Sequence, residues 1–134
     1  MSVRAIRSTL ETHLAGTVGI PDVVHDNQEY ARVVSKNYIR ANFVVTSRRP
    51  SSRGPNPMMR VEGFFVLNVY TPHANGPGAN ETIVELLLAR FEGSTSIQGA
   101  QTNVSIEHAE IMGQGFEDVP FYCTPVIVSW YAYT

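Results

Sequence analysis

The chain has 134 residues, which is the length of one globular domain. Its composition, with 43% hydrophobic and 16% charged residues, excludes a disordered chain. A net charge of −2 argues against a protein that coats nucleic acid or an anionic membrane with its whole surface. The single cysteine, Cys123, excludes an intrachain disulfide, and neither a signal peptide nor a membrane span is predicted, so we expect synthesis in the cytoplasm.

The first predicted element is a helix over Ser2–Ala15. Its apolar side chains recur at intervals of three and four residues, which places them on one helical face: Val3, Ile6, Leu10 and Leu14. We expect Ser2 to cap the start of this helix and Gly16 to end it. A short extended segment is predicted next, around Val23 and Val24.

Two strands follow, separated by a loop. Residues Tyr38–Ser47 alternate between polar side chains and an apolar set, which predicts a half-buried strand with one apolar face: Ile39, Ala41, Phe43 and Val45. Residues Arg60–Thr71 alternate in the same way. Between them, Arg48–Arg60 contain three prolines and a glycine and follow neither period, which predicts a long loop at the tip of a β-hairpin.

The second half of the chain predicts one helix and two strands. We expect Asn80 to cap the helix, whose apolar stripe runs to Gly93: Ile83, Val84, Leu87, Leu88 and Phe91. The strands are Asn103–Ile111 and Pro125–Tyr133. In the first of them, alternation places four side chains on one face: Val104, Ile106, His108 and Glu110.

This order of elements predicts an α+β fold in one domain, residues 1–134. The expected sheet has about four strands, antiparallel or mixed, with two helices packed on one face and a long β-hairpin loop.

Several candidate chemical sites have a simpler structural explanation. The glycine-rich segment before the second helix resembles a phosphate loop, but it lacks the lysine of that motif and Pro77 removes a backbone donor, which favours a joint. His108 and Glu110 form a conceivable acid–base pair, but a solvated strand face has the same pattern. Cys123 has apolar neighbours, which favours an inert thiol. The sequence predicts no catalytic residue, metal site or cofactor.

The strongest local signal is a group of arginines in the predicted hairpin loop: Arg48, Arg49, Arg53 and Arg60. They are four of the ten basic residues, and no acid lies among them. Such a loop is expected to meet an anionic partner, although a solvated hairpin tip would have the same composition. No aromatic residue lies among the arginines, so phosphate contact is favoured over base stacking.

Several segments together resemble the tail terminator proteins of long-tailed bacteriophages and related minor tail and tail-completion proteins. The similar segments are PDVVHDNQEY, EGFFVLNVYTPHANGPGANETIVELLLARFEG, VSIEHAEIMGQG and TPVIVSWYAY, which with the first helix span nearly all of the chain. The resemblance implies a non-enzymatic virion protein at the head-proximal end of the tail, with no membrane partner.

The resemblance also implies partners. Six copies would form a ring that caps the tail tube, stops its polymerisation and docks to a neck or head-completion protein, while genomic DNA passes through the lumen without sequence-specific binding. In that setting the arginine loop would point into the lumen or toward a neighbouring copy. Lumens that conduct DNA are often lined with acids, and the candidates here are Glu62, Glu107, Glu110, Glu117 and Asp118.

Three alternatives stay open at this point. One is a head-completion or connector protein of the phage neck, which would bind the portal or adaptor in place of the tube. A second, from another class, is a small nucleic-acid-binding module that uses the Arg48–Arg60 loop and has salt-sensitive affinity. The third is an enzyme that uses His108 and Glu110 in a concave pocket.

Overall fold

The computed structural model describes residues 3–25, 36–55, 58–72, 78–92, 96–99, 102–112, 116–118 and 121–133. Its two helices are α1 (Val3–Ala15) and α2 (Gly78–Arg90). The strands are β1 (Asp22–Val24), β2 (Tyr38–Pro50), β3 (Met59–Pro72), β4 (Ser96–Gln98), β5 (Asn103–Ile111), β6 (Phe116–Asp118) and β7 (Phe121–Tyr133).

The strands form one mixed, curled sheet in the order β1-β2-β3-β7-β5-β4, and β6 pairs with β7 outside this path. Only the β1–β2 pair is parallel among the described pairs. The α+β class is confirmed, but the prediction of about four strands is too low. The four long strands were expected, whereas β4 and β6 have three residues each, too few for alternation to be recognised.

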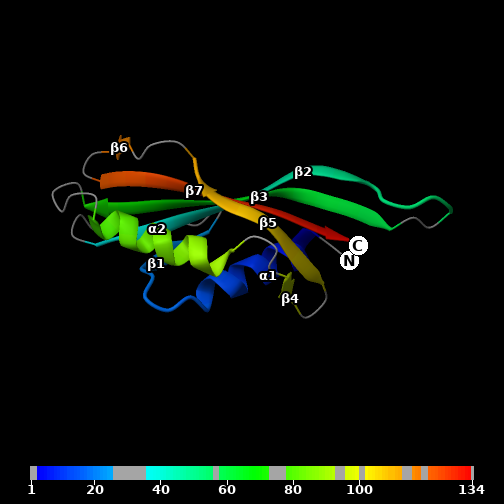
Figure 1. The fold of residues 1–134 in the computed structure, drawn as a ribbon, viewed down its shortest axis with the longest axis horizontal. Coiled ribbons are helices and arrows are strands. Elements are labelled where there is room, and N and C mark those ends of the chain that lie inside the picture. Colours follow the sequence, from blue (N-terminus) through cyan, green and yellow to red (C-terminus); the bar gives the residue numbers. More distant parts are fainter. Residues whose placement is uncertain are drawn as a thin grey trace.

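Both helices pack against the same face of the sheet, as predicted, and the other face carries no described helix (Figure 1). The apolar faces of α1 and α2 meet the inward side chains of the long strands in one core: Ile6, Leu10, Leu14, Leu87 and Phe91 from the helices, and Phe65, Leu67, Val128 and Trp130 from the strands. Val3, predicted to belong to this face, lies at the first turn of α1 and is exposed. Ser2 lies outside the described residues.

The predicted loop Arg48–Arg60 is strand at both of its ends, and the turn between them is shorter than predicted. The last residues of β2 still pair with β3: Arg48 lies opposite Val61, Arg49 opposite Arg60, and Pro50 opposite Met59. Proline is tolerated in an edge strand when the position of its missing N–H faces the open side, where there is no partner strand to bond. The hairpin therefore projects as a paired ribbon beyond the body of the sheet (Figure 1).

The face assignment of β5 was half wrong. The pairing with β7 shifts between Ile106 and His108, so Glu107 is the extra residue of a β-bulge. Val104 and Ile106 point into the core, and beyond the bulge Ala109 takes the inward position. His108 and Glu110 do share a face, but it is the face opposite to Val104 and Ile106.

Asn80 is not the cap of α2, because the helix begins at Gly78. Its side chain is fully buried, and its amide nitrogen lies 3.0 Å from the Val69 oxygen and 3.3 Å from the Tyr122 oxygen. It also lies 3.3 Å from the Thr71 hydroxyl. Asn80 thus ties α2 to β3 and β7. The predicted helix end at Gly93 lies outside the described residues.

Candidate interaction surface

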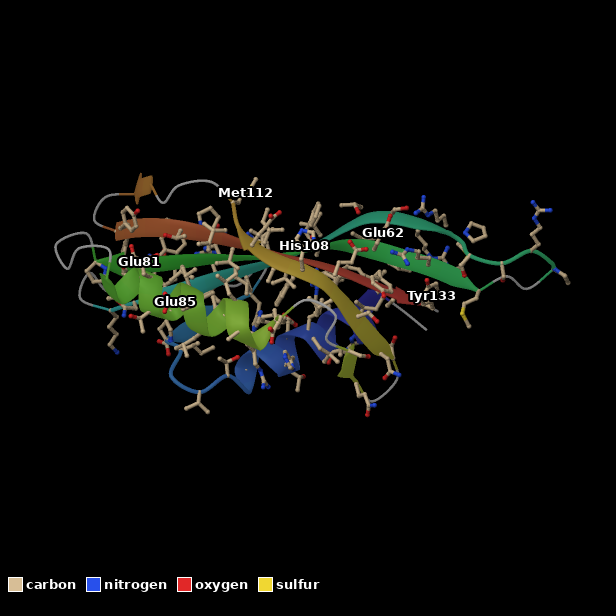
Figure 2. All side chains as sticks on the ribbon, in the orientation of Figure 1. Glu62, Glu81, Glu85, His108, Met112 and Tyr133 are labelled. Atoms are coloured by element: carbon tan, nitrogen blue, oxygen red, sulfur yellow. The ribbon has the colours of Figure 1, made fainter. Side chains whose placement is uncertain are left out.

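The helix-free face of the sheet mixes charged, aromatic and aliphatic side chains. At its centre lie Val44 and Phe64, which face each other across β2 and β3 and are each 40% exposed. Where β3 leaves the body of the sheet, the surface becomes polar around Arg60. Figure 2 shows Glu62 and Tyr133 at this base of the hairpin, with His108 nearer the middle of the sheet.

Arg60 is held by four side chains from three strands. It donates to Glu62 and to Glu107, each at 3.2 Å, and to the Tyr133 hydroxyl at 3.0 Å. Its guanidinium also lies 4.2 Å from the centre of the Tyr131 ring, a cation–π distance. Glu107 lies at the bulge of β5, on the same helix-free face of the sheet as Arg60.

The electrostatics of this cluster keep Arg60 charged. The hydrogen bond with Tyr133 raises the pKa of Arg60 most; partial desolvation opposes the rise, and Glu62 adds to it. With a side chain only 23% exposed, Arg60 is committed to contacts within its own chain. It is therefore less suited to binding an outside anion than its place in the sequence suggested.

The other three arginines of the predicted loop occupy different surroundings. Arg49 shares Glu62 with Arg60, at 3.6 Å, so these two members of the group are brought together. Arg48 is opposite Val61 and points to the helix side of the sheet, beyond the helices. Arg53 lies in the turn at the tip. Within the described residues, Arg48 and Arg53 have no ion pair, and both are exposed.

His108 and Glu110 are close, but their geometry differs from a catalytic relay. The His108 Nε2 atom lies 3.4 Å from Glu110 and 3.4 Å from the Ser129 hydroxyl. A serine–histidine–acid relay uses both ring nitrogens, one toward each partner. Here the same nitrogen faces both groups, and the Ser129 side chain is buried. The arrangement therefore has the character of a surface hydrogen-bond cluster.

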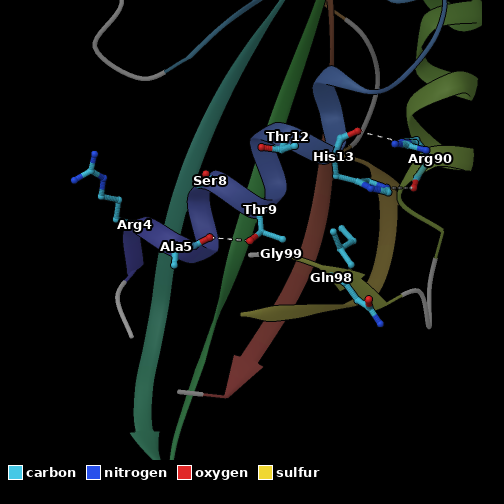
Figure 3. A pocket seen from close by; sticks show the side chains of 10 residues that line it. Arg4, Ala5, Ser8, Thr9, Thr12, His13, Arg90, Gln98 and Gly99 are labelled. Carbon is cyan, nitrogen blue, oxygen red and sulfur yellow. Dashed lines mark hydrogen bonds between the residues drawn. The ribbon is translucent and has the colours of Figure 1, made fainter. Parts of the chain in front are cut away.

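A half-open pocket of about 720 Å³ lies on the helix side, between α1, the end of α2 and β4 (Figure 3). Its described lining has cationic and hydroxyl side chains and no acid: Arg4, Ser8, Thr12, His13 and Arg90 are among them. Reciprocal hydrogen bonds join His13 and Arg90, each side chain to the other's carbonyl oxygen, at 3.0 and 3.1 Å. No pattern in the sequence predicts this pocket, because its residues come from segments far apart in the chain.

The remaining candidate sites are Cys123, the glycine-rich segment and any metal-binding cluster. Cys123 is buried in β7, as the inert-thiol interpretation predicted. Most of the glycine-rich segment lies outside the described residues. Within the described part of the chain, no three metal-binding side chains gather, and no helix is long and apolar enough to cross a membrane.

Residues 5–130 match a family model described as phage tail terminator protein. A solved structure that bears no functional description aligns with a TM-score of 0.76 and 21% sequence identity, covering 100% of this chain and 96% of that one. At that identity the likeness shows a shared fold alone. No curated protein matches the sequence significantly.

Proposed function

The chain belongs to the phage tail terminator family, and we propose that it forms a ring that caps the end of the tail tube. Membership confirms the resemblance seen in the sequence and makes the protein a structural component of the phage tail in the virion. The proposed ring has six copies, stops the polymerisation of the tube protein, and offers its outer end to a neck or head-completion protein.

The observation that carries this proposal is the family match over nearly the whole chain. Two features of the structure support it. The large exposed side chains of the helix-free face, including Val44 and Phe64, suit contact with another protein. The projecting hairpin, with Arg48 and Arg53 free of described ion pairs, can reach a lumen or a neighbouring copy. We propose that genomic DNA passes through this lumen without sequence readout, because arginines without interleaved aromatic residues meet phosphate groups.

A capping experiment with the tail tube protein tests this function. The cognate tube protein is polymerised with increasing amounts of this protein, and tube lengths and end structures are measured in negative-stain images. We expect shorter tubes with a ring at one end, and no further growth after fresh tube subunits are added. Tubes that grow equally long at every concentration would overturn the proposal, and binding to the portal or adaptor in place of the tube would assign the protein to the neck.

A further inference from the structure

The pocket between α1, the end of α2 and β4 has no part in the proposed capping of the tube (Figure 3). Its described lining includes two arginines, Arg4 and Arg90, and no aspartate or glutamate. The whole chain has a net charge of −2, so positive charge gathers here against the overall balance. A cavity lined by charge of one sign concentrates ions of the other sign, which points to an anionic ligand.

Helix α1 supplies two neighbouring rows of lining residues, because helical side chains four positions apart lie on the same face. The rows are Arg4, Ser8 and Thr12, and Ala5, Thr9 and His13. The Thr9 hydroxyl already donates to the Ala5 carbonyl oxygen at 2.8 Å. Within the described residues, the hydroxyls of Ser8 and Thr12 have no hydrogen-bond partner, so both can donate to a ligand.

Arg90, at the end of α2, is held in place and still has unused donors. Its Nε atom donates to the His13 carbonyl oxygen at 3.1 Å, and the His13 Nε2 atom donates in return to the Arg90 carbonyl oxygen at 3.0 Å. Gly16 leaves room for this arrangement, because a Cβ atom there would lie 2.9 Å from the Arg90 Nη2 atom. The Nη1 and Nη2 groups have no hydrogen-bond partner in the described part of the chain. A fixed guanidinium with these donors unused is suited to bidentate binding of an oxyanion.

Strand β4 closes the pocket with a fixed wall. Gly99 lies so close to α1 that a Cβ atom there would collide with the Thr9 hydroxyl, and the Ile97 side chain is buried. The cavity of about 720 Å³ falls within the range of small-molecule sites, roughly 300–1,000 Å³. It is larger than a phosphate ion, so an organic group has room beside the anion.

We propose that this pocket binds a phosphate group, as the free ion or as part of a small phosphate ester. The Nη groups of Arg90 donate to the phosphate oxygens, the hydroxyls of Ser8 and Thr12 donate to further oxygens of the ligand, and Arg4 adds positive charge at the rim. A phosphate group carries between about one and two negative charges at neutral pH, which matches two arginines better than a single carboxylate does. The site belongs to the single chain and does not depend on ring formation.

Amide NMR spectra of the isotope-labelled protein test the site by titration at constant ionic strength. The probes are inorganic phosphate and glycerol phosphate, with glycerol and acetate as the matched neutral and carboxylate controls. We expect saturating shifts at Ser8, Thr12 and Gly99 with both phosphates and none with either control. Tighter binding of glycerol phosphate would support the site with an ester as its ligand, and equal binding would support it with free phosphate. Shifts that do not saturate, or that acetate reproduces, would mean an adventitious ion only and would overturn the proposal.

Replacing the arginines identifies the groups that bind. Arg90→Gln should weaken phosphate binding about tenfold or more, because it removes the charge and the paired donors. Arg4→Gln should weaken it by a smaller factor, since Arg4 is exposed. The matched control, Arg48→Gln, makes the same charge change at an exposed position on the hairpin and should leave binding unchanged. Equal losses in Arg90→Gln and Arg48→Gln would overturn the site, because net charge alone would then explain the binding.

Thermal melting establishes whether each variant is folded, since Arg90→Gln also removes the bond to the His13 carbonyl oxygen. If Arg90→Gln does not fold, the double variant Arg4→Gln with Ser8→Ala decides, because both positions are exposed on α1. Unchanged phosphate affinity in that double variant would overturn the proposal. These titrations contain no tube protein, so a failure to bind phosphate and a failure to cap tubes are separate results.

Discussion

Asn80 donates from one buried amide nitrogen to oxygens on two different strands, which makes it a single-residue joint between α2 and the sheet. Its replacement leaves the carbonyl oxygens of Val69 and Tyr122 without this donor, at a buried and a partly buried position respectively. Loss of buried hydrogen bonds of this kind costs about 2–3 kcal/mol of unfolding free energy, and we expect that loss for Asn80→Ala.

Asn80→Asp should destabilise the fold further at neutral pH, because a carboxylate oxygen would face those carbonyl oxygens. Chemical denaturation followed by circular dichroism measures both variants, with Asn103→Ala at an exposed strand end as the control. An Asn80→Ala variant as stable as the control would show that the hydrogen bonds contribute nothing net.

Arg60 is the corresponding joint on the helix-free face, where it links β3, β5 and β7 through Glu62, Glu107 and Tyr133. Because the cluster is partly solvated, we expect Arg60→Ala to lower the unfolding free energy by only about 1 kcal/mol. Arg60→Lys should recover little, since an ammonium group lacks the planar fork that serves several acceptors at once.

The same denaturation measurement in low and high salt tests this description of Arg60. The loss should shrink as salt is added, because salt screens the ion pairs and leaves the stacking on Tyr131. Charge alone would act at this position if the loss of unfolding free energy were the same in low and high salt and if Arg60→Lys restored it fully.

At the scale of elements, the sequence predicts the helices and strands that are long enough to show a hydrophobic period. Both helices and the four long strands have enough residues for a clear period, and the apolar faces predicted for α1 and α2 pack in the core, apart from Val3 in α1. The bulge at Glu107 reversed the faces of the second half of β5, because one extra residue changes every later side chain to the other side. No local signal marks that extra residue.

The β-hairpin was predicted, but its loop was predicted to be too long, for a different reason. Its prolines and glycine indicate a loop in a single sequence, but pairing with the partner strand carries β2 to Pro50 and starts β3 at Met59. The Arg60 cluster could not be predicted either. Its members lie at positions 60, 62, 107, 131 and 133, and the β3–β7–β5 strand order brings them into contact.

At the scale of the whole molecule, an acidic chain projects a basic ribbon. The net charge is −2, whereas Arg48 and Arg53 stand exposed near the hairpin tip without a described ion pair. In a ring of six, this feature would repeat around one circle and act on any anionic partner there. Two such partners are compatible with the proposed function: DNA in the lumen and the acidic surface of a neighbouring copy.

Reversing both charges, with Arg48→Glu and Arg53→Glu together, separates these two partners. If the tips face DNA, capping should be retained while the yield of infectious particles falls on the order of tenfold, because phosphate contacts become repulsive. If the tips face a neighbouring copy, capping itself should fail. The matched control changes both arginines to lysine, which keeps the charge that a phosphate contact needs. Particles that assemble and deliver DNA normally with the reversed charges would show that the tip is a solvated turn with no anionic partner.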